Sequence, residues 1–173
     1  GTIAIQLAKH LGAFVATTTS TSNVDWVKAL GADVVIDYKQ QNFEEVLRDY
    51  DIVLNSLGPV ELEKSLSILK PGGQLISISG PPTAEFAQEQ KLFWGLGWVM
   101  RLLSSGIRRK ARKKDVRYRF VFMRASGAQL KKITALVESG VIKPVIDRTF
   151  PFESTAEALS YVERGRAKGK VVI

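Results

Sequence analysis

Cysteine is absent from this 173-residue sequence, and histidine occurs only once, as His10. The absence of cysteine excludes disulfides and thiolate metal ligands, and a single imidazole leaves zinc without a credible ligand set inside the chain. A lone histidine in a helical pattern is also far more often a surface or core residue than a general base. We therefore assign no metal ligand and no catalytic residue to this sequence.

Long uninterrupted apolar runs are also lacking. The longest apolar stretch, residues 92–103, contains Gly95, Gly97 and Arg101, and the chain opens on Gly1 with no basic leader and no apolar segment behind it. A membrane-spanning helix needs about 20 apolar residues, so we expect neither a transmembrane span nor a signal peptide in this chain, and a cytoplasmic location. The 45% hydrophobic content suits one globular domain, or one domain with part of another.

Acidic residues are scarce in one segment, and this concentrates the net charge of +8. Between Arg108 and Arg119, eight basic residues accompany one acid, Asp115, so this run alone contributes +7. The apolar face of residues 92–103 followed by this run could describe a membrane-surface helix. We favour a lid or dimer-contact helix that ends in solvated charge, because cations suit a helix C-terminus. The run also lacks interleaved aromatics, so we predict neither a membrane nor a nucleic-acid partner.

Helical and extended patterns alternate at short spacing along the chain. Apolar positions with helical spacing are found at residues 4–11, 26–30, 43–48, 62–69, 128–138 and 154–164. Extended apolar patterns are found at residues 14–19, 34–36, 51–55, 74–79, 118–123, 145–150 and 170–173. This alternation predicts βαβ units and an α/β fold with a doubly wound parallel sheet of the Rossmann type, covered by helices on both faces.

Local signals place several of the element ends. Gly12 follows the first helical pattern where a C-terminal stop belongs, and Ser22 or Asn23 could cap the second. Pro71–Gly73 should end the helix of residues 62–69. Ser154 with Glu157 forms a capping-box pattern, which predicts a helix start there.

A series of short motifs runs in order through the chain. They are Gly1 directly before Thr2–Lys9, then Leu30–Asp33, Val35–Tyr38, Leu69–Gly73, Gly140–Pro144, Phe150–Phe152 and Gly165–Lys170. Each motif is weak by itself, but the ordered set resembles the medium-chain dehydrogenase/reductases, in their zinc-independent quinone oxidoreductase branch. In that family Gly1 would be the last glycine of a glycine-rich turn that follows the first strand of the sheet.

The resemblance implies a division of the chain and a longer parent protein. Residues 1–139 would form the dinucleotide-binding domain without its first strand and glycine-rich turn. Residues 140–173 would be a return segment that packs on a GroES-like catalytic domain of roughly 100 to 150 residues, expected before this chain. We expect the chain by itself to be inactive, and the resemblance also implies a homodimer.

The end of the second expected strand bears on the choice of cofactor. NAD sites place an acid there to bind the ribose 2′-hydroxyl, but no acid occurs between Thr18 and Val24. The hydroxyl and amide groups of this loop could donate to a 2′-phosphate, and the resemblance puts Tyr38 beside the same group. We therefore favour NADP(H) over NAD, although the basic residue of many NADP sites is not evident and the loop could also serve to cap a helix.

The remaining cofactor candidates follow the ends of later strands, where ligands of doubly wound sheets bind. Plain turns would look much the same, and Lys168 and Lys170 could equally be an ordinary solvated strand end. The resemblance nevertheless assigns cofactor contact to these positions. The full set of cofactor candidates is Gly1, Thr2, Thr19, Ser20, Thr21, Asn23, Tyr38, Asn55, Ser56, Leu57, Gly58, Ser79, Gly80, Pro81, Lys168 and Lys170.

Three aromatic residues are candidates for the substrate side of the nicotinamide: Tyr118, Phe120 and Phe122. Alternating aromatics in a strand are more often core, so packing is the preferred interpretation. The resemblance implies an NADPH-dependent reductase of a small-molecule quinone or α,β-unsaturated carbonyl. Two alternatives stay open: a non-catalytic NADP(H)-binding sensor or scaffold, and a zinc alcohol dehydrogenase whose ligands lie outside this chain.

Overall fold

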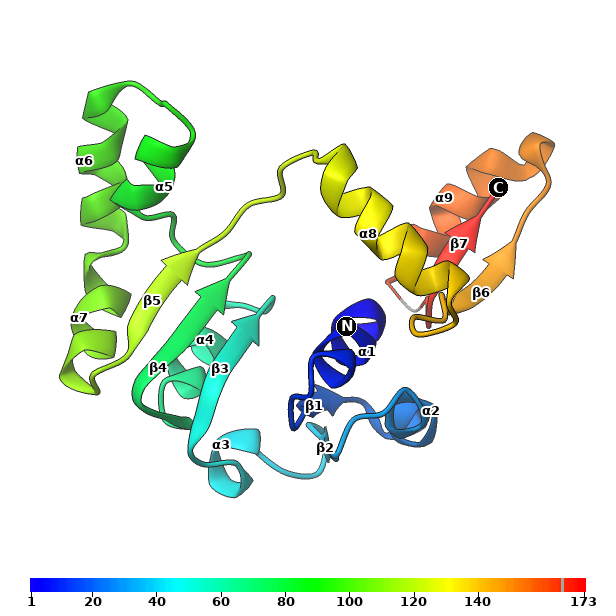
Figure 1. The fold of residues 1–173 in the computed structure, drawn as a ribbon, viewed down its shortest axis with the longest axis horizontal. Coiled ribbons are helices and arrows are strands. Elements are labelled where there is room, and N and C mark those ends of the chain that lie inside the picture. Colours follow the sequence, from blue (N-terminus) through cyan, green and yellow to red (C-terminus); the bar gives the residue numbers. More distant parts are fainter. Residues whose placement is uncertain (166) are drawn as a thin grey trace. The chain divides into compact units, whose positions relative to one another are not determined.

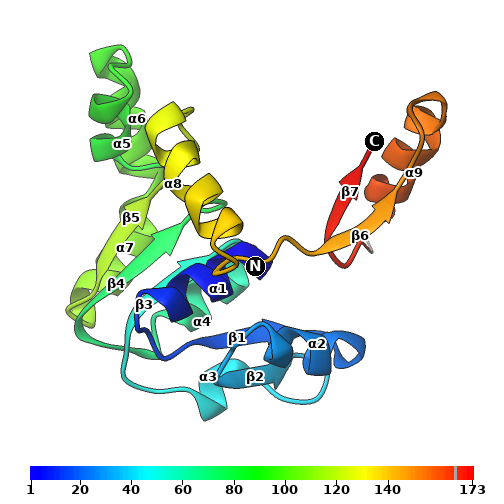
Figure 2. The same cartoon turned by 45° about the vertical axis from the view of Figure 1, so that its right-hand side comes forward.

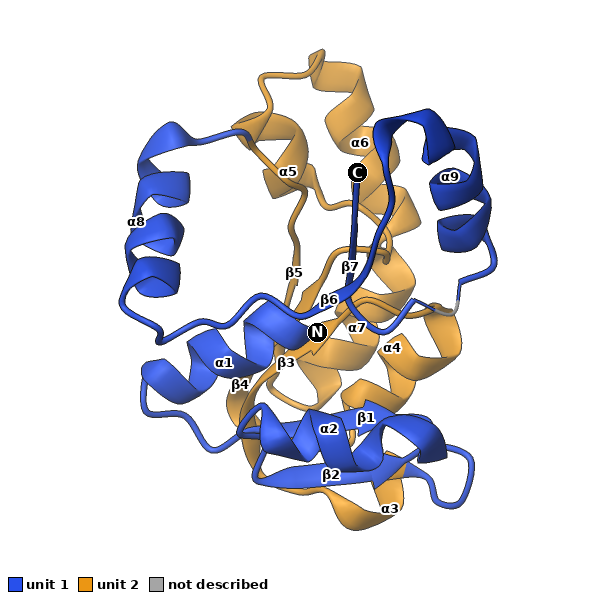
Figure 3. Ribbon diagram, turned by 90° about the vertical axis from the view of Figure 1, so that its right-hand side faces the viewer, with its two compact units in different colours: residues 1–42, 125–173 blue, residues 43–124 orange. Residues whose placement is uncertain are grey.

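The computed structural model describes residues 1–165 and 167–173, and Arg166 of the last motif lies outside the described residues. The elements are shown in Figure 1. The chain folds as two compact units, which Figure 3 colours separately. Unit 1 comprises residues 1–42 and 125–173, and unit 2 comprises residues 43–124.

Unit 1 contains two pairs of parallel strands with helices around them. Its first part runs α1 (Thr2–His10), β1 (Ala16–Thr19), the 3-10 helix η1 (Thr21–Asn23), α2 (Val24–Ala29) and β2 (Val34–Asp37). Its second part runs α8 (Gly127–Glu138), β6 (Ile146–Thr149), the 3-10 helix η2 (Phe152–Ser154), α9 (Thr155–Glu163) and β7 (Lys170–Val172). Strand β1 pairs with β2, and β6 pairs with β7, both in parallel.

The first part of unit 1 packs around a small apolar core. Ile5 of α1, Val27 of α2 and Ala32 before β2 are buried together. The helical spacing of apolar positions in α1 therefore places one face of that helix toward α2 and β2. Gly12 ends the segment with a φ of 81°, a left-handed conformation that favours glycine.

Unit 2 is built on a three-stranded parallel sheet in the order β3-β4-β5. Its elements are α3 (Phe43–Val46), β3 (Tyr50–Asn55), α4 (Pro59–Ser65), β4 (Leu69–Ser77), α5 (Ala84–Glu89), α6 (Trp94–Leu103), α7 (Ser105–Lys113) and β5 (Arg117–Phe120). Figure 2 shows the same sheet from a second direction. Leu62 of α4 and Leu66, which directly follows that helix, pack with Leu75 of β4 and with Ile107 of α7, so α4 and α7 both bury apolar side chains against this sheet.

The expected α/β fold with parallel strands is confirmed. Within the described residues, however, the strands lie in three separate sheets and not in one continuous sheet. Strand β4 also starts at Leu69, earlier than predicted, because Pro71–Gly73 bulge out between two pairings with β3 and do not simply end a helix. Strand β5 ends at Phe120. Residues 121–123, which were predicted to continue this strand, therefore lie outside the sheet.

The predicted helix starts are confirmed, because Asn23 and Ser154 occupy the N-cap positions of α2 and α9. In the described part of the chain, however, neither side chain accepts a capping hydrogen bond, so the capping bonds implied by these patterns are wrong. The Asn23 side chain bonds instead to Ser20 and Trp26. A 3-10 turn, η2, precedes α9 and changes the backbone geometry at Ser154 to a φ of −94° and a ψ of 20°, which is not the extended conformation of a capping residue.

The helices of the described chain are too short, or not apolar enough, to cross a lipid bilayer.

Candidate functional site

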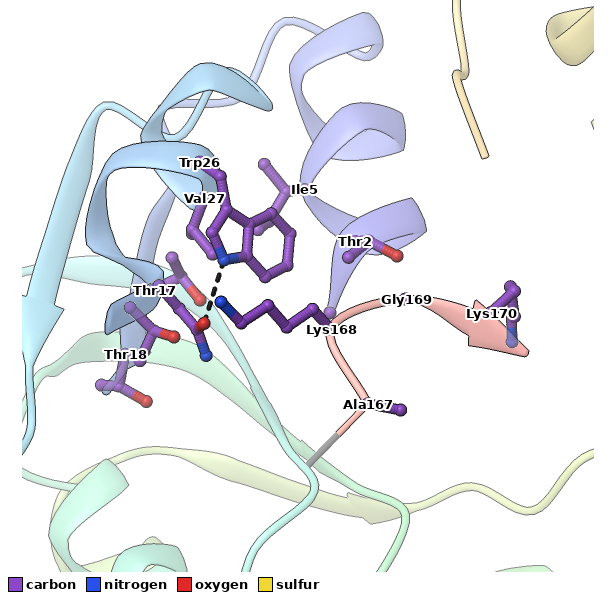
Figure 4. Close-up of a pocket in the computed structure, with 13 residues that line it drawn as sticks. Thr2, Ile5, Thr17, Thr18, Trp26, Val27, Ala167, Lys168, Gly169 and Lys170 are labelled. Carbon is purple, nitrogen blue, oxygen red and sulfur yellow. Dashed lines mark hydrogen bonds between the residues drawn. The ribbon is translucent and has the colours of Figure 1, made fainter. Parts of the chain in front are cut away.

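A cavity of about 370 Å³ in unit 1 gathers residues from distant parts of the sequence. It lies where the N-terminus of α1, the end of β1, the start of α2 and the segment before β7 come together, as Figure 4 shows. Its lining residues are Gly1, Thr2, Ile5, Thr17, Thr18, Thr19, Asn23, Trp26, Val27, Ala167, Lys168, Gly169 and Lys170.

The N-terminus of α1 gives this cavity an electropositive wall. Gly1 occupies the capping position and supplies no side-chain hydrogen bond to the first turn. The first intrahelical bond runs from the Ile5 amide to the Gly1 carbonyl, over 3.0 Å. Amides ahead of it in the first turn therefore point out of the helix end, where the helix dipole favours an anion.

Lys168 adds a full positive charge to the same cavity. Figure 4 shows its side chain reaching into the cavity beside Trp26, whereas the Lys170 side chain turns away. Gly169 makes this arrangement possible, because a β-carbon there would stand 2.9 Å from the Val145 carbonyl carbon. The Lys170 amide bonds the Val145 carbonyl over 2.7 Å, which fixes the segment that carries Lys168.

Hydroxyl and amide groups line the opposite side. Thr17, Thr18 and Thr19 of β1 are half-buried at the cavity wall. The Trp26 indole nitrogen donates to Asn23 Oδ1 over 3.0 Å, and Asn23 Nδ2 donates to Ser20 Oγ over 3.2 Å. The Trp26 ring is therefore held at the cavity by a local hydrogen-bond chain, and it offers a flat apolar surface next to polar groups.

A carboxylate stands at the end of β2, beside the loop that follows β1. Asp37 is buried, and its pKa is lowered chiefly by a hydrogen bond from the Thr21 side chain, with the Lys39 amide at 3.0 Å as a further donor. Tyr38, the next residue, is exposed, and its amide donates to the Thr19 carbonyl over 3.1 Å. The buried charge of Asp37 thus holds the loop of Thr21 in place, while the Tyr38 ring faces solvent.

A second polar cluster lies in unit 2, at the carboxyl ends of β3 and β4. Asn55 and Ser77 are buried, and Ser77 Oγ donates to Asn55 Oδ1 over 3.1 Å. The exposed Ser79 donates to the Leu57 carbonyl over 2.6 Å, and the Gly80 amide donates to Ser77 Oγ over 2.9 Å. These bonds join the loops after the two strands into one rigid turn.

Tyr118 of β5 closes this cluster. Its hydroxyl donates to the Pro81 carbonyl over 2.8 Å, and burial raises its pKa to about 12 despite a hydrogen bond with Ser77. The phenol therefore stays protonated at neutral pH and is not a general base. Ser56, Leu57 and Gly58 are exposed in the adjoining loop.

The other two aromatic candidates are placed by packing. Phe120 is buried, with its ring centroid 5.0 Å from that of Phe86 in an edge-to-face contact. The Phe122 centroid lies 6.4 Å from the same Phe86 ring, although Phe122 remains exposed. The preferred packing interpretation is confirmed for Phe120.

The predicted cofactor residues thus fall into two groups. Six of them line the unit 1 cavity, namely Gly1, Thr2, Thr19, Asn23, Lys168 and Lys170. Ser20, Thr21 and Tyr38 lie in the adjacent loops, and the other seven belong to the unit 2 turn. Sequence reasoning missed Trp26 and Ser77, although Trp26 stands three residues after Asn23, within reach along one helical turn.

The described residues contain no cluster of three or more histidine, cysteine, aspartate or glutamate side chains suited to a metal ion.

Residues 30–173 match the sequence model of a protein family described as zinc-binding dehydrogenase. Over its full length the chain is 36% identical to the 2-methylene-furan-3-one reductase of Solanum lycopersicum and spans 37% of it. It is 33% identical, again over its full length, to the chloroplastic NADPH-dependent alkenal/one oxidoreductase of Arabidopsis thaliana, and spans 37% of that protein.

Its fold is similar to that of a solved quinone oxidoreductase from Coxiella burnetii, with a TM-score of 0.75 and 26% sequence identity. That match covers 98% of this chain and 47% of the solved one. The chain therefore spans less than half the length of each of these three proteins.

Proposed function

Because this chain belongs to the zinc-binding dehydrogenase family, we propose that it is the nucleotide-binding part of an NADPH-dependent oxidoreductase that reduces a quinone or an α,β-unsaturated carbonyl. The names of the tomato and Arabidopsis relatives, which are reductases of unsaturated ketones and aldehydes, support this acceptor class. The bacterial quinone oxidoreductase supports the quinone alternative within the same class.

The observation that carries the proposal is the pairing of a helix N-terminus with a lysine in one cavity. The open first turn of α1 and the Lys168 side chain both offer positive charge to the same space. A dinucleotide pyrophosphate fits this arrangement, because backbone amides at a helix end and a nearby cation are the groups that bind phosphate in doubly wound folds. Trp26 adds a flat apolar wall against which an adenine or ribose face can pack.

We propose NADP(H) as the cofactor, on the loop that follows β1. This loop offers Ser20, Thr21 and Asn23, and Asp37 at the end of β2 is buried beside it, with its Oδ2 atom left without a hydrogen-bond partner in the described part of the chain. Because this carboxylate is buried, it does not present its charge to a 2′-phosphate as an exposed one would. Tyr38 is exposed next to this loop and is free to contact the same group.

The unit 2 turn would hold the ribose and nicotinamide. Asn55, Ser77 and Ser79 are already joined by hydrogen bonds, so a ligand meets a preformed surface and little order is lost on binding. When NADPH is bound, its nicotinamide supplies the hydride. The residues of this chain orient the cofactor, and Tyr118 donates a hydrogen bond from a neutral phenol without moving a proton.

The remaining proposals concern the parent protein. We propose that residues 1–139 bind the nucleotide, that residues 140–173 return to a catalytic domain, and that the reaction needs no zinc. We also propose a homodimer and a cytoplasmic location. Because one relative is chloroplastic, cell fractionation is the test of the proposed location.

Turnover by the full-length protein tests the function. We expect NADPH to be oxidised in preference to NADH with quinones or enones as acceptors, and a metal chelator to leave the rate unchanged. Tight NADPH binding without turnover of any quinone, enone or aldehyde would indicate a sensor or scaffold. Loss of activity with the chelator would instead indicate a zinc alcohol dehydrogenase.

One lysine at the cavity and one away from it test the proposed phosphate site. Lys168→Gln should raise the KM for NADPH about tenfold with little change in kcat, since a charge-assisted hydrogen bond to phosphate contributes about 1.5–3 kcal/mol. Lys132→Gln on α8 is the matched control, because this exposed side chain does not line the cavity, and its KM should stay near that of the wild type. Equal KM values for the two variants would reject the assignment of Lys168.

A further inference from the structure

Helix α6 of unit 2 exposes a large apolar surface. Trp94 is 74% exposed, Trp98 is 66% exposed and Leu102 is 75% exposed, and these positions lie along one side of the helix. Within the described residues no side chain of α6 is buried, although the helix is rich in large apolar residues. A helix of a soluble protein normally buries its apolar side against the core, and a large exposed apolar patch is typical of an interaction site.

Small residues turn the large ones outward. Where α6 approaches α5, a β-carbon at Gly97 would meet the Ala87 side chain at 3.9 Å, so small residues face each other at this point. The Phe93 and Trp94 rings lie 5.3 Å apart between centroids, tilted by 50°, and the Arg101 guanidinium lies 5.6 Å from the centroid of the Trp98 ring. The surface of α6 is therefore an ordered, aromatic and apolar one next to a cation.

Helix α7 follows α6 along the edge of unit 2 beside β5 (Figure 1) and carries the first five cations of the basic run, up to Lys113. Ile107 and Ala111 anchor α7 in the core, so its cations point outward. Lys110 pairs with Glu63 at 2.5 Å, and Arg108 lies 3.8 Å from Glu85. Arg119 of β5 pairs with Glu89 at 3.1 Å. In the described part of the chain, no ion pair involves the remaining cations of the run, which are Arg109, Arg112, Lys113, Lys114 and Arg117.

Against the expectation from the sequence that no membrane is a partner, we propose that α6 and α7 together form a docking surface for an anionic lipid membrane. The apolar side of α6 would lie in the interface between headgroups and acyl chains, where tryptophan is favoured, and the cations of α7 would contact anionic headgroups. Neither helix is long enough to span a bilayer, so the contact is peripheral. This inference is independent of the proposed reductase activity.

The combination of charges and apolar groups favours lipid over other partners. A nucleic-acid surface would use the cations of α7 but has no use for the exposed leucines and valine of α6. A lid, or a contact between two copies, would use the apolar side of α6 but would leave the cations of α7 in solvent, without a ligand. An anionic membrane satisfies both features at once.

Vesicle binding by the full-length protein tests the proposal. We expect the protein to co-sediment with vesicles of phosphatidylcholine and phosphatidylglycerol, to bind pure phosphatidylcholine vesicles weakly, and to dissociate as salt rises. Tryptophan emission should shift to shorter wavelength on binding, because Trp94 and Trp98 leave water.

Three double variants separate the contributions. Trp98→Ser with Leu102→Ser, and separately Arg112→Gln with Lys113→Gln, should each weaken binding to anionic vesicles about tenfold or more, and the second should also flatten the salt dependence. Lys131→Gln with Lys132→Gln on α8 removes the same charge elsewhere and should bind as the wild type does. All six side chains are exposed, so the variants should unfold at wild-type temperatures.

Several results would overturn the proposal. One is that the full-length protein does not bind vesicles, whether or not its basic run binds DNA or RNA. Another is that the α8 control loses as much vesicle binding as the other two variants. A third is that the α6 variant binds vesicles as the wild type does. A monomer produced from a dimer by the α6 substitutions, with vesicle binding unchanged, would assign this surface to a second copy of the chain.

Discussion

Gly80 stands where three side chains converge. A β-carbon at this position would lie 2.6 Å from the Tyr118 hydroxyl oxygen, 2.9 Å from Ser77 Oγ and 3.0 Å from Leu62 Cδ2. Glycine is therefore required at this position because there is no room for a β-carbon, and not because of the backbone conformation. The resulting close approach lets the Gly80 amide donate to Ser77 and keeps Tyr118 on the Pro81 carbonyl.

We expect Gly80→Ala to destabilise the protein by about 1–3 kcal/mol, because the added methyl group overpacks this cluster. Combining it with Tyr118→Phe removes the nearest of the three atoms and should recover part of the loss. Urea unfolding of the two single variants and the double variant measures this coupling. Strictly additive losses would show that the methyl group and the hydroxyl do not compete for the same space.

Tyr118 should lose its phenol proton at a higher pH than an ordinary tyrosine does. Burial raises its pKa to about 12, so the folded state prefers the neutral phenol. A folded-state pKa above the ordinary value of about 10 contributes stability that is complete below pH 10 and is lost as pH rises toward 12. Phenolate absorbance followed against pH should show a step at high pH that Tyr118→Phe reduces, with the remainder from Tyr161, whose pKa is raised chiefly by its hydrogen bond to Asp147. A titration curve unchanged by that substitution would contradict the assignment.

At the scale of elements, a single glutamine connects α1 to the segment after α8. Gln6 is buried and forms a two-way bond with the backbone of Lys143: its Nε2 donates to the carbonyl over 3.0 Å, and its Oε1 accepts from the amide over 2.8 Å. This arrangement mimics the pairing of two peptide groups. It holds the start of the 140–173 segment against the helix whose N-terminus forms the candidate phosphate site.

Gln6→Leu should cost about 2–3 kcal/mol, because it leaves the amide and the carbonyl of Lys143 without their partner while the volume stays similar. The Lys143 amide should then exchange its hydrogen with solvent much faster. Hydrogen exchange measures this, and Gln88→Leu on the exposed side of α5 serves as the matched control. Unchanged exchange at Lys143 would mean that other contacts hold the segment.

Helix α6 and strand β4 show two further ways in which elements depart from their local signals. The apolar spacing of α6 is that of a helix with a partner, yet the described residues leave it exposed. In β4, Tyr50 pairs with Leu69 and Ile52 pairs with Gln74, so the proline and glycines between them loop out of an otherwise continuous strand. Pairing with β3 decides this outcome, and pairing is not a local property.

At the scale of the whole molecule, carboxylates with lowered pKa values occur in both units. The pKa of Asp33 is lowered chiefly by the Lys9 side chain, that of Asp37 by Thr21, and that of Glu44 by Lys64. Each group binds its proton less tightly in the folded state. Folding is therefore favoured above the ordinary carboxyl range near pH 4, and this contribution is lost as pH falls through the lowered values.

We expect the unfolding temperature to be nearly constant from pH 7 to about pH 5 and to fall below about pH 4. Asp37→Asn should lower stability at neutral pH and make the acid decline shallower, because one of the shifted groups is gone. Calorimetry across this pH range provides the measurement. An acid decline equally steep in the variant would exclude Asp37 as a contributor.

The separation of the sheets also belongs to the whole molecule. Within the described residues β1 pairs only with β2, and β3 pairs only with β4. The edges that these pairings leave free expose backbone donors and acceptors to unwanted pairing.

The sequence by itself determined the α/β class, the positions of most helices and strands, and the family, because apolar period and short ordered motifs are local properties of the chain. It also placed Lys168, Asn23 and Thr19 among the candidates that share one cavity. Only the tertiary structure decided that Gln6 binds Lys143, 137 positions away, that Trp26 and Ser77 belong to the candidate sites, and that α6 stays uncovered. Such features depend on contacts between segments that are far apart in the sequence, and the local sequence around a residue does not determine those contacts.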